Sequence, residues 1–206
     1  MDLSDKTIER ICRVFGYLDV LEKRGVDFIS SRDLALGVGA TEYTIRKDIS
    51  LLNITSYTRK GYKVEHLKKE LGKRLHLDQK RKACIVGLGR LGAALLDYER
   101  FKEDGFEIVA GFDSNINKLE RIRTDIEVFP VTNMEDIIKQ KSIELGIIAV
   151  PEVGAQVVVD RLISSGIKGI LNFSNTKIIV PKNIIYLNID FTSALRFIAS
   201  KFITQN

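Results

Sequence analysis

Three glycines and one aspartate have the types and spacing that a dinucleotide site needs. Gly87, Gly89 and Gly92 form the pattern Gly-x-Gly-x-x-Gly, and Asp113 follows about 20 residues later, where dinucleotide-binding folds place an acid. The first glycine allows a tight turn, the second lets a pyrophosphate approach the backbone, and the third lets a helix pack on a strand. A carboxylate at Asp113 could accept hydrogen bonds from ribose hydroxyls. These four residues therefore predict a dinucleotide site.

The residues around the glycines give this weak motif its context. An apolar strand precedes Gly87, an apolar helix follows it, and a second strand ends at Asp113. The carboxylate favours NAD(H) over NADP(H), because it repels a 2′-phosphate, although Lys118 lies close in the sequence. The alternative is a Rossmann-like domain that has kept the turn and lost its ligand. The residues predicted here to bind the cofactor are Gly87, Leu88, Gly89, Arg90, Leu91, Gly92 and Asp113.

A second group of residues with suitable chemistry lies in the first 80 residues, which carry four of the five net positive charges. Two predicted helices, 31–36 and 41–52, are joined by a short turn that contains glycine, as is typical of a helix-turn-helix. Such motifs use the first residues of the second helix on base edges and phosphates. The predicted DNA-binding residues of the two helices are Ser31, Thr41, Tyr43, Thr44, Arg46 and Lys47.

Residues 57–61 form a basic hairpin tip between short extended segments around Ile54 and at 62–64. After a helix-turn-helix, such a hairpin is interpreted as a wing, whose cations Arg59 and Lys60 can reach phosphate or the minor groove. The alternative is that both are solvated charges on a turn.

Apolar periodicity predicts the elements that position these residues. The predicted fold class is α/β, with an N-terminal winged helix-turn-helix followed by a Rossmann-like parallel sheet. The predicted domains are 1–78 for DNA binding, 79–189 for NAD(H) binding and 190–206 for a C-terminal helix. A basic segment, 79–82, is predicted to link the first two domains. The predicted helices are 7–23, 31–36, 41–52, 64–75, 134–141, 155–165 and 192–202, and the predicted sheet strands are 83–86, 107–112, 127–130, 145–150, 169–172 and 184–188.

Ligands bind at the carboxyl ends of parallel strands. Two later strands end at Val150-Pro151 and at Asn172-Phe173. These four residues are therefore predicted to lie beside the nicotinamide half of the cofactor.

The last predicted helix, 192–202, is apolar over more than half of its circumference. Such a helix must be buried, either on its own sheet or in a second subunit, and the sequence does not choose between them.

No apolar run approaches the roughly 20 residues that span a bilayer. The distant cysteines, Cys12 and Cys84, favour buried reduced thiols over a disulfide. We therefore expect a cytoplasmic protein.

An enzymatic function lacks candidate residues. A dehydrogenase needs a substrate domain and a group that handles the proton accompanying hydride transfer. Both histidines, His66 and His76, precede the nucleotide fold, and neither has a metal-spaced partner. We therefore predict no enzymatic activity and no metal site, and interpret the cofactor as a sensed ligand.

These segments together resemble the Rex family of bacterial repressors, which respond to the NADH/NAD+ ratio. The resemblance covers nearly the whole chain, and its most specific segment is 166–173. The other matching segments are 28–35, 45–50, 87–92 with Tyr98, 149–151 and 188–190.

The resemblance implies a homodimer that exchanges its C-terminal helices and holds two winged helices on a palindromic DNA operator. NAD+ permits DNA binding, whereas NADH closes the dimer and releases the operator. By the same resemblance, Tyr98, Asp190 and Arg10 take part in switching, with Arg10 as the partner of Asp190. The alternative is a DNA-binding regulator whose Rossmann domain binds another nucleotide or serves only in dimerisation.

The wing departs from the family pattern. Family members carry a glycine-rich wing, whereas this chain has Thr58-Arg59-Lys60-Gly61-Tyr62. Fewer glycines leave less freedom for close backbone approach to DNA. The operator sequence and affinity are therefore less predictable than the fold.

Overall fold

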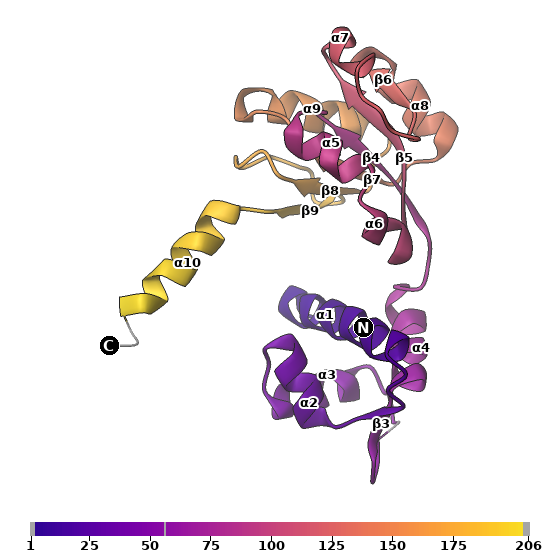
Figure 1. Cartoon of the computed structure of the whole chain (residues 1–206), viewed down its shortest axis with the longest axis vertical. Coiled ribbons are helices and arrows are strands. Elements are labelled where there is room, and N and C mark those ends of the chain that lie inside the picture. Colours follow the sequence, from indigo (N-terminus) through magenta and orange to yellow (C-terminus); the bar gives the residue numbers. More distant parts are fainter. Residues whose placement is uncertain (1–2, 56, 204–206) are drawn as a thin grey trace. The chain divides into compact units, whose positions relative to one another are not determined.

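The computed structural model describes residues 3–55 and 57–203, and the chain divides into two compact units, Met1–Gln79 and Lys80–Asn206 (Figure 1). Each unit has its own apolar core. The elements of the first unit are α1 (Asp5–Lys23), β1 (Phe28–Ile29), α2 (Ser31–Val38), α3 (Glu42–Leu51), β2 (Tyr57–Thr58), β3 (Gly61–Lys63) and α4 (Val64–Leu75).

Hydroxyl side chains start the first three helices. Ser4, Ser30 and Thr41 each accept a hydrogen bond from the backbone N–H three residues later, which satisfies one of the free donors of the first turn. Gly39 ends α2 with φ of +67°, a left-handed conformation that glycine adopts without strain. The helices α2 and α3, joined by this turn, confirm the predicted helix-turn-helix.

The strands of the first unit form an antiparallel sheet of order β1-β3-β2, in which β2 and β3 are the two sides of the wing. The prediction of an extended segment around Ile54 was wrong in position, because the wing pairs Tyr57 with Tyr62 and Thr58 with Gly61. Ile54 lies before the strand and is buried in the core of this unit, which accounts for its apolar character.

The second unit is a parallel six-stranded sheet of order β6-β5-β4-β7-β8-β9, with helices between all of its successive strands except β8 and β9. The sheet confirms the predicted Rossmann-like fold. Its elements are β4 (Arg81–Val86), α5 (Arg90–Leu96), α6 (Glu99–Glu103), β5 (Phe106–Asp113), α7 (Ile116–Leu119), β6 (Val128–Pro130), a 3-10 turn η1 (Val131–Asn133), α8 (Met134–Lys141), β7 (Leu145–Ile148), α9 (Glu152–Ser164), β8 (Gly169–Asn172), β9 (Ile185–Asn188) and α10 (Phe191–Ile203).

Both faces of this sheet are covered, because successive side chains of a strand point to opposite faces. On β4, Cys84 and Val86 pack with apolar side chains of α8 and α9. Ala83 and Ile85 pack instead in a second apolar cluster, which includes Leu88 and Leu96 at the two ends of the α5 region. A strand buried on both faces reads as a continuous apolar run, which is how β4 appears in the sequence.

The predicted linker at 79–82 is partly strand. Arg81 and Lys82 belong to β4, because the backbone N–H of Arg81 donates to Gly105 O and the strand continues its parallel pairing with β5 to Phe106. The charged ends of both side chains are satisfied outside the core, by the Glu144 carboxylate and the Lys141 carbonyl oxygen. The basic residues Arg81 and Lys82 therefore begin strand β4 and do not belong to a linker.

Both cysteines are free thiols, but only one is buried as predicted. Cys84 lies within β4, and burial raises the pKa of its thiol to about 12. Cys12 is exposed, because its position on α1 does not face the apolar core of its unit.

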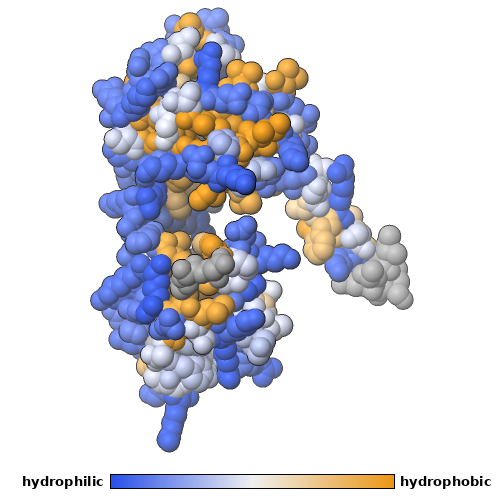
Figure 2. Space-filling view, turned by 180° about the vertical axis from the view of Figure 1, so that it is seen from behind, coloured by the Kyte–Doolittle hydropathy of each residue, from blue (hydrophilic) through white to orange (hydrophobic). Residues whose placement is uncertain are grey.

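In α10, every side chain that the structure describes is exposed, including Phe191, Leu195, Phe197, Ile198 and Phe202. Apolar side chains of this helix are visible at the surface in Figure 2. In the single chain, α10 is therefore not buried on its own sheet, which was one of the two sites of burial considered.

Within the described residues, no helix is both long and apolar enough to span a membrane.

Candidate functional site

Two of the three glycines are required by the packing of the protein itself. A Cβ atom at Gly87, where φ is +93°, would lie 2.7 Å from the carbonyl oxygen of Ala149, and one at Gly92 would lie 1.9 Å from that of Gly87. A Cβ atom at Gly89 would meet nothing within 4 Å. The space at Gly89 is therefore not filled by the protein.

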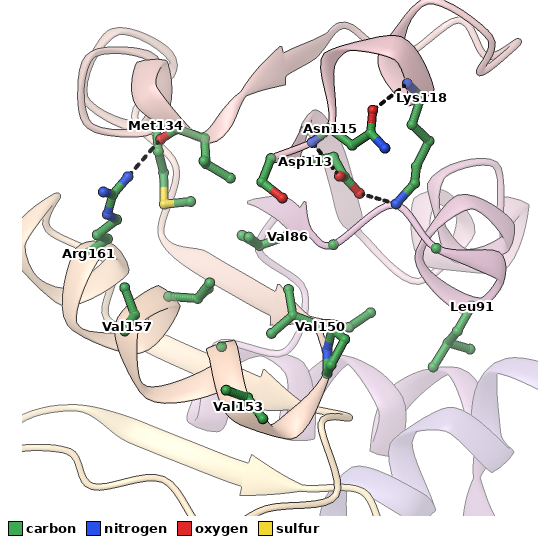
Figure 3. Close-up of a pocket in the computed structure, with 18 of the residues that line it drawn as sticks. Val86, Leu91, Asp113, Asn115, Lys118, Met134, Val150, Val153, Val157 and Arg161 are labelled. Carbon is green, nitrogen blue, oxygen red and sulfur yellow. Dashed lines mark hydrogen bonds and ion pairs between the residues drawn. The ribbon is translucent and has the colours of Figure 1, made fainter.

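A pocket of about 990 Å³ lies at the carboxyl ends of β4, β5 and β7 (Figure 3). This is where open α/β sheets bind their ligands. Of the predicted cofactor-binding residues, the pocket brings together Gly87, Gly89, Arg90, Leu91, Asp113, Val150 and Pro151. Its size and mostly apolar wall suit an organic ligand with a small number of polar anchors.

Asp113 is the buried anion of the pocket, with an exposed fraction of 4%. Its carboxylate accepts hydrogen bonds from the backbone N–H groups of Leu88 and Asn115 and from Lys118 Nζ, each at 2.8 Å. Burial alone would raise the pKa of Asp113, but the hydrogen bonds from Lys118, Asn115 and Leu88 outweigh it and lower the pKa. Because a carboxylate can accept about four hydrogen bonds, one position stays available for a ribose hydroxyl.

Two predicted residues of the glycine motif support the pocket from behind. Leu88 is buried, and its N–H fixes Asp113. Gly92 lies against the carbonyl group of Gly87 at the start of α5. Neither residue lines the pocket, and direct contact of either with a nucleotide stays a prediction.

Asn172 and Phe173 also lie outside the lining of the pocket. The side chain of Asn172 is buried and fully engaged, because it donates to Thr176 O and Asn188 Oδ1 and accepts from the N–H and hydroxyl groups of Ser174. Phe173 packs its ring 5.8 Å from that of Phe191, centroid to centroid. Their contact with the cofactor therefore stays a prediction.

The far wall of the pocket was missed from the sequence. It is formed by Met134, Val157 and Arg161, of which Arg161 Nη1 donates to Val131 O at 3.5 Å (Figure 3). These residues belong to α8 and α9 and fit no short motif. The only sequence signal for this wall was that α8 and α9 each lie near strands whose carboxyl ends meet at the same edge of the sheet.

The predicted DNA-binding residues of the first unit gather on α2 and α3. Tyr43 and Lys47 are exposed on α3. Thr41 caps α3 by accepting from the Thr44 N–H, and the two hydroxyls lie 2.7 Å apart. Arg46 points toward Ser31, whose hydroxyl accepts from its Nε at 3.0 Å.

Ser31 itself is 1% exposed, so in this conformation it holds Arg46 rather than presenting its hydroxyl outward. Arg59 and Lys60 lie in the tight turn of the wing, and Lys60 Nζ lies 5.7 Å from the centroid of the Phe28 ring. Their contact with DNA stays a prediction.

The three predicted switch residues have different surroundings. Tyr98 is 49% exposed just before α6, with its ring edge against Phe101. Asp190, just before α10, is exposed and accepts from the N–H and hydroxyl groups of Ser193, and the hydroxyl bond lowers the pKa of Asp190.

Arg10 already has a carboxylate partner within its own unit. Its Nε and Nη2 donate to the two oxygens of Asp48 at 2.5 and 2.9 Å, and this pairing raises the pKa of Arg10. Asp48 is 3% exposed. The pair therefore joins α1 to the inner face of α3.

Comparisons with known proteins find similarity in both parts of the chain. A family model described as a CoA binding domain matches residues 78–176, and one described as a Putative DNA-binding protein N-terminus matches residues 2–50. A protein of Carboxydothermus hydrogenoformans named Redox-sensing transcriptional repressor Rex is 37% identical over 190 residues, which cover 92% of this chain and 91% of the relative. The protein of the same name from Clostridioides difficile is 36% identical, with coverage of 94% and 92%.

Two solved structures of a similar protein, RSP, cover the whole chain. The crystal structure of RSP in complex with beta-NADH has a TM-score of 0.87 and 34% identity, and covers 100% of this chain and 96% of the other. RSP in complex with beta-NAD+ and operator DNA has a TM-score of 0.85 and 35% identity, with coverage of 100% and 94%.

Proposed function

This chain belongs to the Rex family of redox-sensing transcriptional repressors, and we propose on this basis that it binds operator DNA and senses the NADH/NAD+ ratio. The first unit carries the DNA-binding helices, and the second carries the nucleotide pocket. One observation supports the ligand most directly. Within a tightly packed glycine turn, Gly89 alone of the three glycines faces open space, beside an anchored carboxylate, Asp113.

The residues present fit a dinucleotide. Gly89 leaves room for a pyrophosphate, Asp113 keeps one acceptor position for a ribose hydroxyl, and Val150 and Pro151 form an apolar wall. When bound, the dinucleotide supplies two redox states that differ in the charge and shape of the nicotinamide ring. A sensor needs only to bind the two states with different affinities.

We propose that the chain acts as a homodimer on a palindromic operator. The exposed apolar side chains of α10 support this, since a second copy offers the apolar surface that the single chain does not. A two-fold symmetric dimer presents its two recognition helices to two half-sites, so the palindrome of the operator follows from the symmetry of the protein.

Tyr98, Asp190 and Arg10 are proposed as the switch residues. Tyr98 and Asp190 are both exposed, and either can meet a second subunit. Arg10 keeps Asp48 through Nε and Nη2, so it can meet Asp190 either through its remaining Nη1–Nη2 edge or by leaving Asp48, and an unpaired buried carboxylate is costly. Only an exchange that breaks the pair requires a compensating partner for Asp48 in the second state.

The same proposal gives the protein no reaction of its own, no resident metal and a cytoplasmic location. Its curated relatives are named repressors. Among the residues that the structure describes, no group of three or more His, Cys, Asp or Glu side chains could hold a metal ion.

A titration tests the function directly. The full-length protein is bound to a fluorescent palindromic Rex-type operator at one fixed salt concentration, and NADH and NAD+ are then added separately. We expect NADH to release the DNA at concentrations where NAD+ has little effect. Operator binding that neither nucleotide changes would contradict redox sensing and favour another nucleotide or a dimerisation role for the second unit.

A further inference from the structure

One edge of the Arg46 guanidinium is held by the protein. Its Nε donates to Ser31 Oγ at 3.0 Å, and its Nη2 forms an ion pair with Glu42 Oε1 at 2.5 Å. The Ser31 hydroxyl in turn donates to the same Glu42 oxygen at 2.8 Å. The three side chains form a closed triangle at the start of α2 and α3.

The planar geometry of arginine decides what remains free. Nε and Nη2 share one edge of the guanidinium, and Nη1 and Nη2 share the next. With the first edge occupied by Ser31 and Glu42, the second still presents two parallel N–H groups. This fork fits a pair of acceptors, such as O6 and N7 of guanine or two phosphate oxygens.

The wing fixes the remaining freedom of this side chain. Tyr57 of β2 lies under Arg46, with the guanidinium carbon 5.4 Å from the ring centroid. The Tyr57 ring is itself held edge-on by Tyr62 at 4.9 Å. Arg46 is therefore held in its plane by α2 and α3 and on its face by the wing, while its side chain stays 55% exposed.

The helix dipole favours an acid at this position, in the first turn of α3, but the same acid carries a cost for DNA binding. Glu42 lies in the first turn of the predicted recognition helix, where its charge opposes the approach of phosphates. The pair with Arg46 is solvent-exposed, at 55% and 41% for the two side chains, and pairs of this kind contribute little to folding.

We propose that Glu42 is a positioning residue for DNA recognition, which orients the free fork of Arg46 toward a paired acceptor on the operator. The inference rests on the proposed DNA-binding function and adds to it a residue that the sequence motifs did not indicate. Ser31 and Tyr57 complete the support of Arg46. The fixed orientation of Arg46 offsets the repulsion between the Glu42 carboxylate and the DNA phosphates.

The test compares Glu42→Ala with Glu70→Ala in the full-length protein. Glu70 and Arg74 also form an i,i+4 pair, on α4, so the control removes the same charge from the same unit. The probe is the DNA duplex that the wild-type protein enriches from a random-sequence pool, and the competitor is the same duplex with its bases shuffled. Anisotropy at fixed salt gives the ratio of specific to non-specific affinity.

We expect Glu42→Ala to lower this ratio about tenfold, within the range of a lost bidentate base contact. Glu70→Ala should leave the ratio unchanged, and Glu42→Gln, whose amide oxygen still accepts from Ser31 and Arg46, should fall between the two. In an Arg46→Ala background, Glu42→Ala should have no further effect, because coupled residues are not additive. A ratio unchanged by Glu42→Ala, or an equal loss in the Arg46→Ala background, would overturn the proposal.

Two further arms separate the remaining outcomes. Replacing guanine by 7-deazaguanine removes N7, so weaker wild-type binding that Arg46→Ala does not weaken further identifies guanine as the acceptor, and unchanged binding would contradict a contact to guanine. If the wild-type protein enriches no sequence, the proposed function fails together with this inference. If wild-type binding is released by NADH and the Glu42→Ala ratio is unchanged, only this inference fails.

Discussion

At the scale of single residues, the glycines of the nucleotide loop have separable roles. Gly92 faces the carbonyl group of Gly87, and Gly89 faces open space. The sequence pattern gives both residues the same weight, because it records only spacing. The structure distinguishes a glycine that the fold needs from one that the fold leaves free, which we propose serves the ligand.

The substitutions Gly89→Ala and Gly92→Ala should therefore fail in different ways. Gly89 has φ of −69° and room for a methyl group, so Gly89→Ala should keep its melting temperature and lose NADH affinity by about tenfold or more. Gly92→Ala should lower the free energy of unfolding by about 1–3 kcal/mol, as overpacking does. Thermal unfolding and NADH titration of both variants check this. A Gly89→Ala protein that binds NADH normally would remove the phosphate-approach role from this glycine.

At the scale of elements, the pair of Arg10 and Asp48 joins α1 to α3 and so fixes the helix that is predicted to read DNA. Asp48 carries its charge on the buried face of α3, beside Ile45 and Ile49. A buried carboxylate is tolerated only with a partner, and Arg10 supplies two hydrogen bonds.

The substitution Arg10→Ala should destabilise the first unit by about 3 kcal/mol, the lower end of the range for a broken buried pair, because Arg10 is 19% exposed. Lys68→Ala is the control, since Lys68 also joins α4 to α1 through Asp19 and Glu22 but in a more exposed position, and should cost about 1 kcal/mol or less. Urea unfolding of both variants gives the comparison. Equal costs would mean that the Asp48 pair is not a buried clamp.

Much of the element order was predictable, because amphipathic periodicity and caps are local properties. Helix α4 and strand β8 have the bounds that the sequence predicts. Segments governed by long-range contacts were predicted less well. The first residues of β4 are strand because β5 pairs with them, and the wing begins at Tyr57 because Ile54 is drawn into the core.

The same distinction holds for the candidate site. The glycine loop, Asp113, Val150 and Pro151 could be predicted, since a motif or the carboxyl end of a strand marks each of them. Met134 and Arg161 could not, because only the packing of α8 and α9 brings them to the pocket. The partners of Arg10 and Arg46 likewise depend on how three helices pack.

At the scale of the whole molecule, α10 is the element that the single chain leaves unexplained. Phe191, Leu195, Ile198 and Phe202 recur at helical spacing, and each is more than half exposed. An apolar stripe of this length is stable in water only when another surface covers it. We therefore expect the isolated protein to be a dimer in which α10 supplies much of the interface.

The substitution Ile198→Asp should convert this dimer to a monomer, because it places a charge in the apolar stripe. Ser200→Asp is the matched control, since it adds the same charge two residues later, outside that stripe. Light scattering during gel filtration measures the mass, and circular dichroism shows whether the monomer stays folded, as expected for a helix whose described side chains are all exposed in the single chain. Because one winged helix engages only one half-site, the Ile198→Asp monomer should also lose its preference for a palindrome over a single half-site. An Ile198→Asp protein that remains dimeric, or a wild-type protein that is monomeric, would show that α10 is covered in some other way.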